Sequence, residues 1–247
     1  MNIISKTLCA FLIVSGIAVH AQAQFKDLVN GAEKAVSGQG GKGGGLSQGE
    51  ISDGLREALQ VGAKNATGKV SAANGFFGDA LIKVLMPPDA KKVENTLRQM
   101  GMGDQVDQLI LSMNRAAEDA SAKALDIFVN AIKSMSIQDA LSILNGGNDA
   151  ATQYLKSKTN ADLTKAFKPV IQQSLDKVNA TKYWATVFNT YNGLPTTFKK
   201  VNPDLPGYVT ERALNGVFVY LAQEEAKIRK DPAAQVTDLL KKVFGSH

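Results

Sequence analysis

The sequence predicts an all-α protein, with a single domain of about ten helices behind an N-terminal leader. Apolar residues from Leu46 onward recur every three or four positions, which is the period of a helix with one buried face. No stretch alternates with period two for long enough to predict a strand. Capping residues, glycines and prolines divide the chain into segments of helix length.

Residues 1–23 have the pattern of a cleavable secretory signal peptide. Lys6 precedes an apolar run from Leu8 to Val19, and Ala21-Gln22-Ala23 places small residues before the cleavage point. The run is shorter than the roughly 20 residues that span a bilayer, so an uncleaved anchor helix is the less favoured alternative. We therefore expect an exported protein, periplasmic or fully secreted.

Residues 24–45 connect the leader to the main domain. The apolar residues between Phe25 and Val36 predict a short amphipathic helix. Six of the eight residues from Gly38 to Gly45 are glycine, which predicts a flexible tether. A phosphate-binding loop is not predicted, because its Gly-Lys-Ser/Thr ending is missing and no strand precedes the glycines. The helical domain then covers residues 46–247.

Helix signals organise the first half of this domain. Ser47 and Glu50 form a capping box before a stripe of Ile51, Leu55 and Leu59. A second apolar segment, residues 76–86, stops at Pro87-Pro88. Asp89 is then expected to cap a helix that ends near Gly101. Its inward residues should be Val93, Leu97 and Met100. One long helix is expected over residues 104–134.

The second half continues in the same way. Ser136 and Asp139 begin a helix that Gly146-Gly147 close, and a short helix follows at 149–157. The next helix carries Pro169, where a kink or a break is expected, and the apolar pattern then continues to Gly193. Residues 193–206 contain three prolines and should form the longest ordered loop. Helices are expected over 208–229 and again from Asp231-Pro232.

Histidine and cysteine are too few for most familiar catalytic sites. Cys9 and His20 lie in the leader, and His247 is the terminal residue. Catalytic triads, Cys-His pairs and common zinc sites need imidazole or thiolate on a rigid framework. We therefore expect no disulfide, no metal site and no cofactor. A glycosidase pair formed by Glu224 and Glu225 is disfavoured, because adjacent helical residues do not face each other. Glu225 should instead pair with Arg229.

The charge of the chain is mildly basic and unevenly distributed. Residues 46–145 hold 10 basic and 12 acidic side chains, whereas residues 146–247 hold 14 and 9. This asymmetry suggests weak attraction to anionic surfaces such as lipid head groups. An ordinary solvated surface is the favoured alternative, because no basic run exceeds two residues. No nucleic-acid partner is expected.

A polar cluster on the long helix is the first candidate site, formed by Asn114, Arg115 and Glu118 with Arg229. Apolar residues flank it, so a glutamate there must be paired or hydrogen-bonded. Glu118 is either a ligand-binding or catalytic acid with a raised pKa, or a structural residue paired with an arginine such as Arg229 or Arg212. The structural interpretation is favoured.

An aromatic patch is the second candidate site, formed by Tyr183, Trp184 and Tyr191 and followed by Tyr208 after the proline-containing loop. Helical spacing favours a role in the core. Exposed rings beside the basic half of the chain would instead suggest a ligand-facing groove.

Three groups of residues together resemble an exported bacterial family catalogued as domain of unknown function 4197. They are Met113 to Glu118, then Asp139 to Leu155, and finally Asp204 through Tyr208 to Asp231-Pro232. The resemblance covers roughly residues 46–245, and it implies a single helical domain behind a signal peptide without implying any activity.

The favoured function is a non-enzymatic binding or interaction module of the bacterial envelope. Its partner would be an envelope protein, a lipid or another apolar ligand. Two alternatives remain open, namely a carboxylate-dependent hydrolase acting on an envelope polymer and a structural envelope component.

Overall fold

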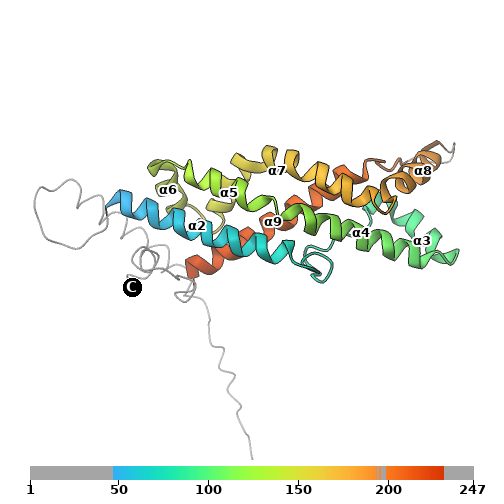
Figure 1. The fold of residues 1–247 in the computed structure, drawn as a ribbon, viewed down its shortest axis with the longest axis horizontal. Helices are drawn as coiled ribbons and strands as arrows, with labels where there is room; N and C mark the ends of the chain where they lie inside the picture. The colour runs from blue at the N-terminus through green and yellow to red at the C-terminus, as the bar shows by residue number, and fades with distance from the viewer. Residues whose placement is uncertain (1–46, 194, 196–198, 231–247) are drawn as a thin grey trace, which may run out of the picture. The chain divides into compact units, whose positions relative to one another are not determined.

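A computed structural model describes residues 47–193, 195 and 199–230, and this part of the chain contains helices and no strand (Figure 1). The expected all-α fold is thereby confirmed. The leader, the helix at 25–36, the glycine tether and the helix after Asp231 lie outside the described residues. The expected total of about ten helices therefore stays a prediction.

The described elements follow one another along the chain as helices with short connections, apart from one long non-helical segment after the first. They are α2 (Gln48–Ser71), η1 (Pro88–Ala90), α3 (Lys91–Gln99), α4 (Gly103–Ser121), α5 (Ala124–Lys133), α6 (Ile137–Leu144), α7 (Ala150–Asp176), α8 (Ala180–Gly193) and α9 (Leu205–Lys230).

The core lies where α9 packs against α2, α4 and α7, and where α7 packs against α4 and α5. Figure 1 shows α9, in orange to red, running along α2 and α7 over much of their length. Aromatic side chains fill this core, with Phe76, Phe128 and Phe167 fully buried. Phe128 meets Phe218 edge to face at 5.8 Å between ring centroids.

The helix expected over 104–134 is divided at Ala122-Lys123, so that prediction is wrong. The hydroxyl of Ser121 donates to the carbonyl of Ala117 at 2.7 Å. The Lys123 N–H bonds to the carbonyl of Ala120, three residues earlier, whereas an α-helix would use the carbonyl four residues earlier. A serine bonded back to the preceding turn competes with the backbone ladder and bends a helix. The change of direction separates α4 from α5.

Conversely, the two helices expected across 149–178 form the single helix α7, which continues through Pro169 without a break. Proline removes the bond to the carbonyl of residue 165, but Lys165 and Pro169 are both exposed, so the loss falls on the solvent-facing side of the helix. Phe167 and Ile171, on either side of the proline, are fully buried. Their packing holds the helix together at this point.

The segment of residues 72–87 is the longest connection among the described elements, whereas the longest loop was expected at residues 193–206. It contains turns and then an extended stretch rather than a helix. Ile82, Val84 and Met86 are buried, whereas Leu85 between them is 53% exposed. This short alternation is the period of an extended chain with one buried face.

Helix α3 ends at a left-handed glycine, as expected near Gly101, whose φ is +79°. The N–H of Met102 bonds to the Leu97 carbonyl at 2.9 Å, and that of Gly101 bonds to Arg98 at 3.1 Å. This turn at the end of α3 directs the Met100 side chain outward, where it is 70% exposed. The prediction that Met100 points inward is therefore wrong. Asp89 lies inside η1 rather than at a helix cap.

Candidate functional site

Glu118 of α4 holds the start of the 72–87 segment. Its carboxylate accepts the backbone N–H groups of Phe76 and Phe77 at 3.0 and 3.1 Å, and its second oxygen pairs with Arg115 at 2.6 Å. Arg115 also donates to the side chain of Asn74 at 2.8 Å, where the backbone has a positive φ of 64°. The charge of Glu118 is therefore neutralised within a folded loop.

Asn114 holds the other end of the same segment. Its side-chain amide accepts the N–H of Val84 at 2.8 Å and donates to the Val84 carbonyl at 2.8 Å, so it pairs with both backbone groups of one residue. Its NH₂ group also donates to Ile110 at 2.7 Å. The Asn114 side chain is fully buried, and both of its N–H donors are engaged.

Three of the four residues of the predicted polar cluster thus come together on α4, and Arg229 does not join them. The partner of Glu118 is Arg115, in place of Arg229 or Arg212. Glu118 is 4% exposed, and both of its carboxylate oxygens are engaged. These contacts support the interpretation in which Glu118 locks the packing of the loop.

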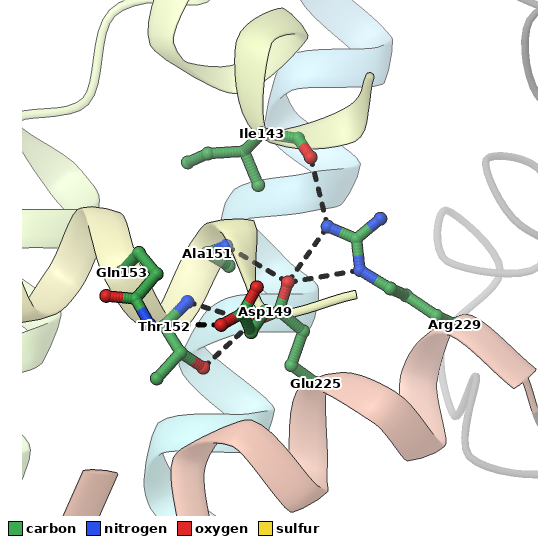
Figure 2. A network of polar contacts seen from close by, with 7 residues as sticks. All are labelled: Ile143, Asp149, Ala151, Thr152, Gln153, Glu225 and Arg229. Atoms are coloured by element: carbon green, nitrogen blue, oxygen red, sulfur yellow. Dashed lines mark hydrogen bonds and ion pairs between the residues drawn. The ribbon is translucent and has the colours of Figure 1, made fainter. Parts of the chain in front are cut away.

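Arg229 belongs to a second network, in which Glu225 of α9 caps the start of α7 (Figure 2). Glu225 accepts the N–H of Ala151 at 3.0 Å, and both the N–H and the hydroxyl of Thr152 at 2.8 Å. Arg229 pairs with Glu225 at 2.9 Å, as expected from their spacing, and donates to the Ile143 carbonyl at 3.0 Å. A carboxylate facing unpaired N–H groups at a helix start is favourable.

The space beside this network is too small for a ligand. A hollow lined by Leu55, Leu59 and Glu225 holds about 10 Å³, which is the room of about one water molecule. The Glu225–Arg229 network therefore joins α6, α7 and α9 and leaves no ligand cavity beside it.

The predicted aromatic residues do not line a common groove. Trp184 is 2% exposed, lies 4.3 Å from the ring of Phe188, and donates to the Asn202 carbonyl at 3.3 Å. The hydroxyl of Tyr208 donates to the Leu85 carbonyl at 2.8 Å, and Tyr191 meets Phe188 edge to face. Tyr183 is 66% exposed. Most of this patch supports packing.

A hollow of about 410 Å³ lies elsewhere, between α7 and α9. We call it the α7–α9 groove. One wall is a ridge of α7 with four polar side chains at four-residue spacing, namely Lys156, Asn160, Thr164 and Lys168. The other wall and the floor come from α9 and include Thr210, Glu211, Arg212, Leu214, Asn215 and Phe218. The polar ridge on α7 is the sequence signal that could have indicated it.

Positive charge dominates the α7–α9 groove. Three cations, Lys156, Lys168 and Arg212, line it, against the carboxylate of Glu211 in the lining and that of Asp204 beside Lys168. Lys156 lies over the Phe218 ring at 5.8 Å, and Lys168 pairs with Asp204 at 3.5 Å. These two contacts place the later part of α7 beside the start of α9, so the helices run antiparallel along the groove.

Arg212 makes one ion pair and one ring contact in the groove. It makes a long ion pair of 3.2 Å with its neighbour Glu211, and its guanidinium lies 6.0 Å from the ring of Tyr208. Its Nε atom is buried and has no hydrogen-bond partner. A buried donor without a partner costs free energy.

The described residues contain no group of three or more His, Cys, Asp or Glu side chains that could hold a metal ion. No helix among them is long and apolar enough to cross a membrane. A model of the family described as protein of unknown function DUF4197 matches residues 45–245. No curated protein and no solved structure matches the chain.

Proposed function

The chain belongs to the DUF4197 family of proteins of unknown function, and from that premise we propose that it is a non-enzymatic binding module of the bacterial envelope. Its binding surface is the α7–α9 groove, and its ligand is anionic. One observation carries this proposal: three cations line the α7–α9 groove, against the carboxylate of Glu211 and that of Asp204 beside Lys168, which leaves an excess of positive charge.

The structure lends less support to the other functions considered. A hydrolase would need an acid that reaches its substrate, whereas the carboxylate of Glu118 is buried and engaged by Arg115 and two backbone N–H groups. An apolar ligand would need an apolar groove, whereas Trp184 is part of the core and the α7–α9 groove has a basic wall. An anionic ligand fits better.

The proposal places the protein outside the cytoplasm, in the periplasm or beyond it. Support comes from the charged start, the apolar run and the Ala-Gln-Ala ending of residues 1–23. The intact mass of the protein recovered from a periplasmic extract tests this placement. A mature chain that begins at Gln24 is expected, and a full-length chain retained in the cytoplasm would contradict it.

Co-purification from the native compartment tests the binding role. In the groove variant, Lys156, Lys168 and Arg212 are each replaced by Gln. In the control variant, the same replacement is made at three exposed lysines outside the groove, namely Lys165, Lys177 and Lys182. The two variants lose the same charge from the same region of the protein.

Mass spectrometry of the purified proteins should find an anionic molecule with the wild type and the control variant. The groove variant should lose this molecule. Equal recovery from all three proteins would show that the groove is not the binding surface.

A further inference from the structure

We infer that the occupant of the α7–α9 groove is an anionic polysaccharide chain that lies along the groove and contacts its three cations in turn. This inference rests on the proposed function, because it names the class of ligand that the same groove would take.

The positions of the cations favour a chain over a small anion. Lys156 and Lys168 are twelve residues apart on α7, which corresponds to about 18 Å of helix. Arg212 lies about midway between Asp204 and Phe218, the α9 contacts of these two lysines. A compact anion would reach one cation, whereas an extended ligand with repeated charges would reach all three.

The groups between the cations favour sugar hydroxyls over a peptide. Asn160 and Asn215 each offer amide donors and acceptors, and the hydroxyl of Thr164 keeps its acceptor lone pairs while it donates to the Asn160 carbonyl. Both walls are helices whose backbone groups bond within the helix. A peptide backbone would therefore find no strand edge to pair with.

The floor of the groove suits the apolar faces of sugar rings. Leu214 and Phe218 show only 7% and 6% of their surface, which gives a narrow apolar strip between polar walls. Such a mixture of a small apolar surface and convergent polar groups is typical of ligand sites. A lipid tail would need a larger apolar surface than this strip.

The ion pairs that the groove cations already make are weak enough to be replaced by a ligand. Lys168 and Asp204 are 3.5 Å apart and both about half exposed, and Arg212 and Glu211 are 3.2 Å apart. Exposed pairs of this kind contribute little to stability. An incoming carboxylate, sulfate or phosphate group on a sugar chain could thus replace them at little cost.

Titration calorimetry with defined probes tests the class of ligand. The probes are di-, tetra- and hexagalacturonate, the neutral sugar maltohexaose, hexaglutamate peptide, phosphatidylglycerol vesicles and a short polyacrylate. The wild type, the groove variant and the control variant are titrated with each probe at low salt, and circular dichroism checks that all three proteins are folded.

The expected result is that hexagalacturonate binds the wild type and the control variant, more tightly than its shorter forms, and binds the groove variant at least about tenfold more weakly. Equal or tighter binding of maltohexaose, hexaglutamate or the vesicles would overturn the inference. In that case, a loss of polyacrylate binding in the groove variant would leave the proposed function standing, although the inference about the class of ligand fails. If the groove variant binds every probe as the wild type does, both fail.

Discussion

Glu225 accepts hydrogen bonds from both the backbone N–H and the hydroxyl of Thr152. Glu225 and Thr152 are 73 positions apart in the chain. This contact joins the start of α7 to α9, the two helices that form the walls of the proposed groove. The Glu225 side chain is 5% exposed and also pairs with Arg229. The geometry of the groove therefore depends on a buried carboxylate at one end of α7.

The replacement Glu225→Gln should lower the free energy of unfolding by about 2–4 kcal/mol, because Arg229 loses its charged partner and an amide cannot accept all three hydrogen bonds. Urea unfolding followed by circular dichroism measures the change. Glu211→Gln, at a side chain that is 74% exposed, is the control and should change the value by less than about 0.5 kcal/mol. Equal effects of the two replacements would disprove the capping role.

The replacement Asn114→Ala should release the 72–87 segment, because both backbone groups of Val84 lose their partner in a buried place. We expect a loss of about 2–4 kcal/mol and faster hydrogen exchange at the Val84 amide. Ser112→Ala, at a partly exposed position of the same helix where the hydroxyl bonds only to the Gln108 carbonyl, is the control. Unchanged exchange at Val84 in the Asn114→Ala variant would contradict the role given to Asn114.

Two glycine replacements should have effects of opposite sign. A Cβ atom at Gly216 would lie 2.7 Å from Cζ of the fully buried Phe76, so Gly216→Ala should destabilise the protein by about 1–3 kcal/mol. A Cβ atom at Gly68, within α2, would meet nothing within 4 Å. Gly68→Ala should therefore stabilise the protein by about 0.5–1 kcal/mol. Melting temperatures compare the two, and a stable Gly216→Ala variant would refute the packing of Phe76 on α9.

The hydrogen bond from Tyr220 to Asp79 should make stability depend on pH at both extremes. This bond lowers the pKa of the Asp79 carboxyl below its ordinary value and raises the pKa of Tyr220 to about 12. The contribution of neutral Tyr220 is complete below about pH 10 and is lost as the pH rises towards 12. That of ionised Asp79 is complete above about pH 4 and is lost as the pH falls through its lowered pKa.

Thermal unfolding of the wild type and of Tyr220→Phe across this pH range measures the effect. The variant should lose less stability than the wild type between about pH 10 and 12, because it lacks the group that titrates there. Parallel curves for the two proteins would show that the Tyr220–Asp79 bond has no such effect.

The sequence predicted those features whose cause is local. The helix expected to begin at Ser136 and Asp139 does begin there, with a capping box, and Gly101 ends α3, because each depends on residues within one helical turn. The extended stretch at 83–86 was not predicted, because Val84 is held by Asn114, which lies 30 residues away. Without knowledge of this contact, a short alternation of buried and exposed side chains cannot be distinguished in the sequence from any other short apolar run.

The candidate site also depends on contacts between residues far apart in the sequence, which could not be predicted. The contacts of Glu118 with the loop at Phe76 could not be inferred from its helix alone, so an arginine of another helix was the expected partner. The α7–α9 groove needs the antiparallel placement of Lys156 and Phe218, which their sequence separation does not reveal. The groove lies in the half of the chain with the basic excess, residues 146–247, although an ordinary solvated surface was the favoured interpretation of that excess.

The dissociation constant of a short polyacrylate for the groove variant and for the control variant tests the central claim most directly. The two proteins carry the same net charge, so general attraction to a polyanion is equal for both. If the α7–α9 groove is the binding surface, the groove variant should bind at least about tenfold more weakly, a difference of about 1.4 kcal/mol. Equal dissociation constants for the two variants would contradict the claim.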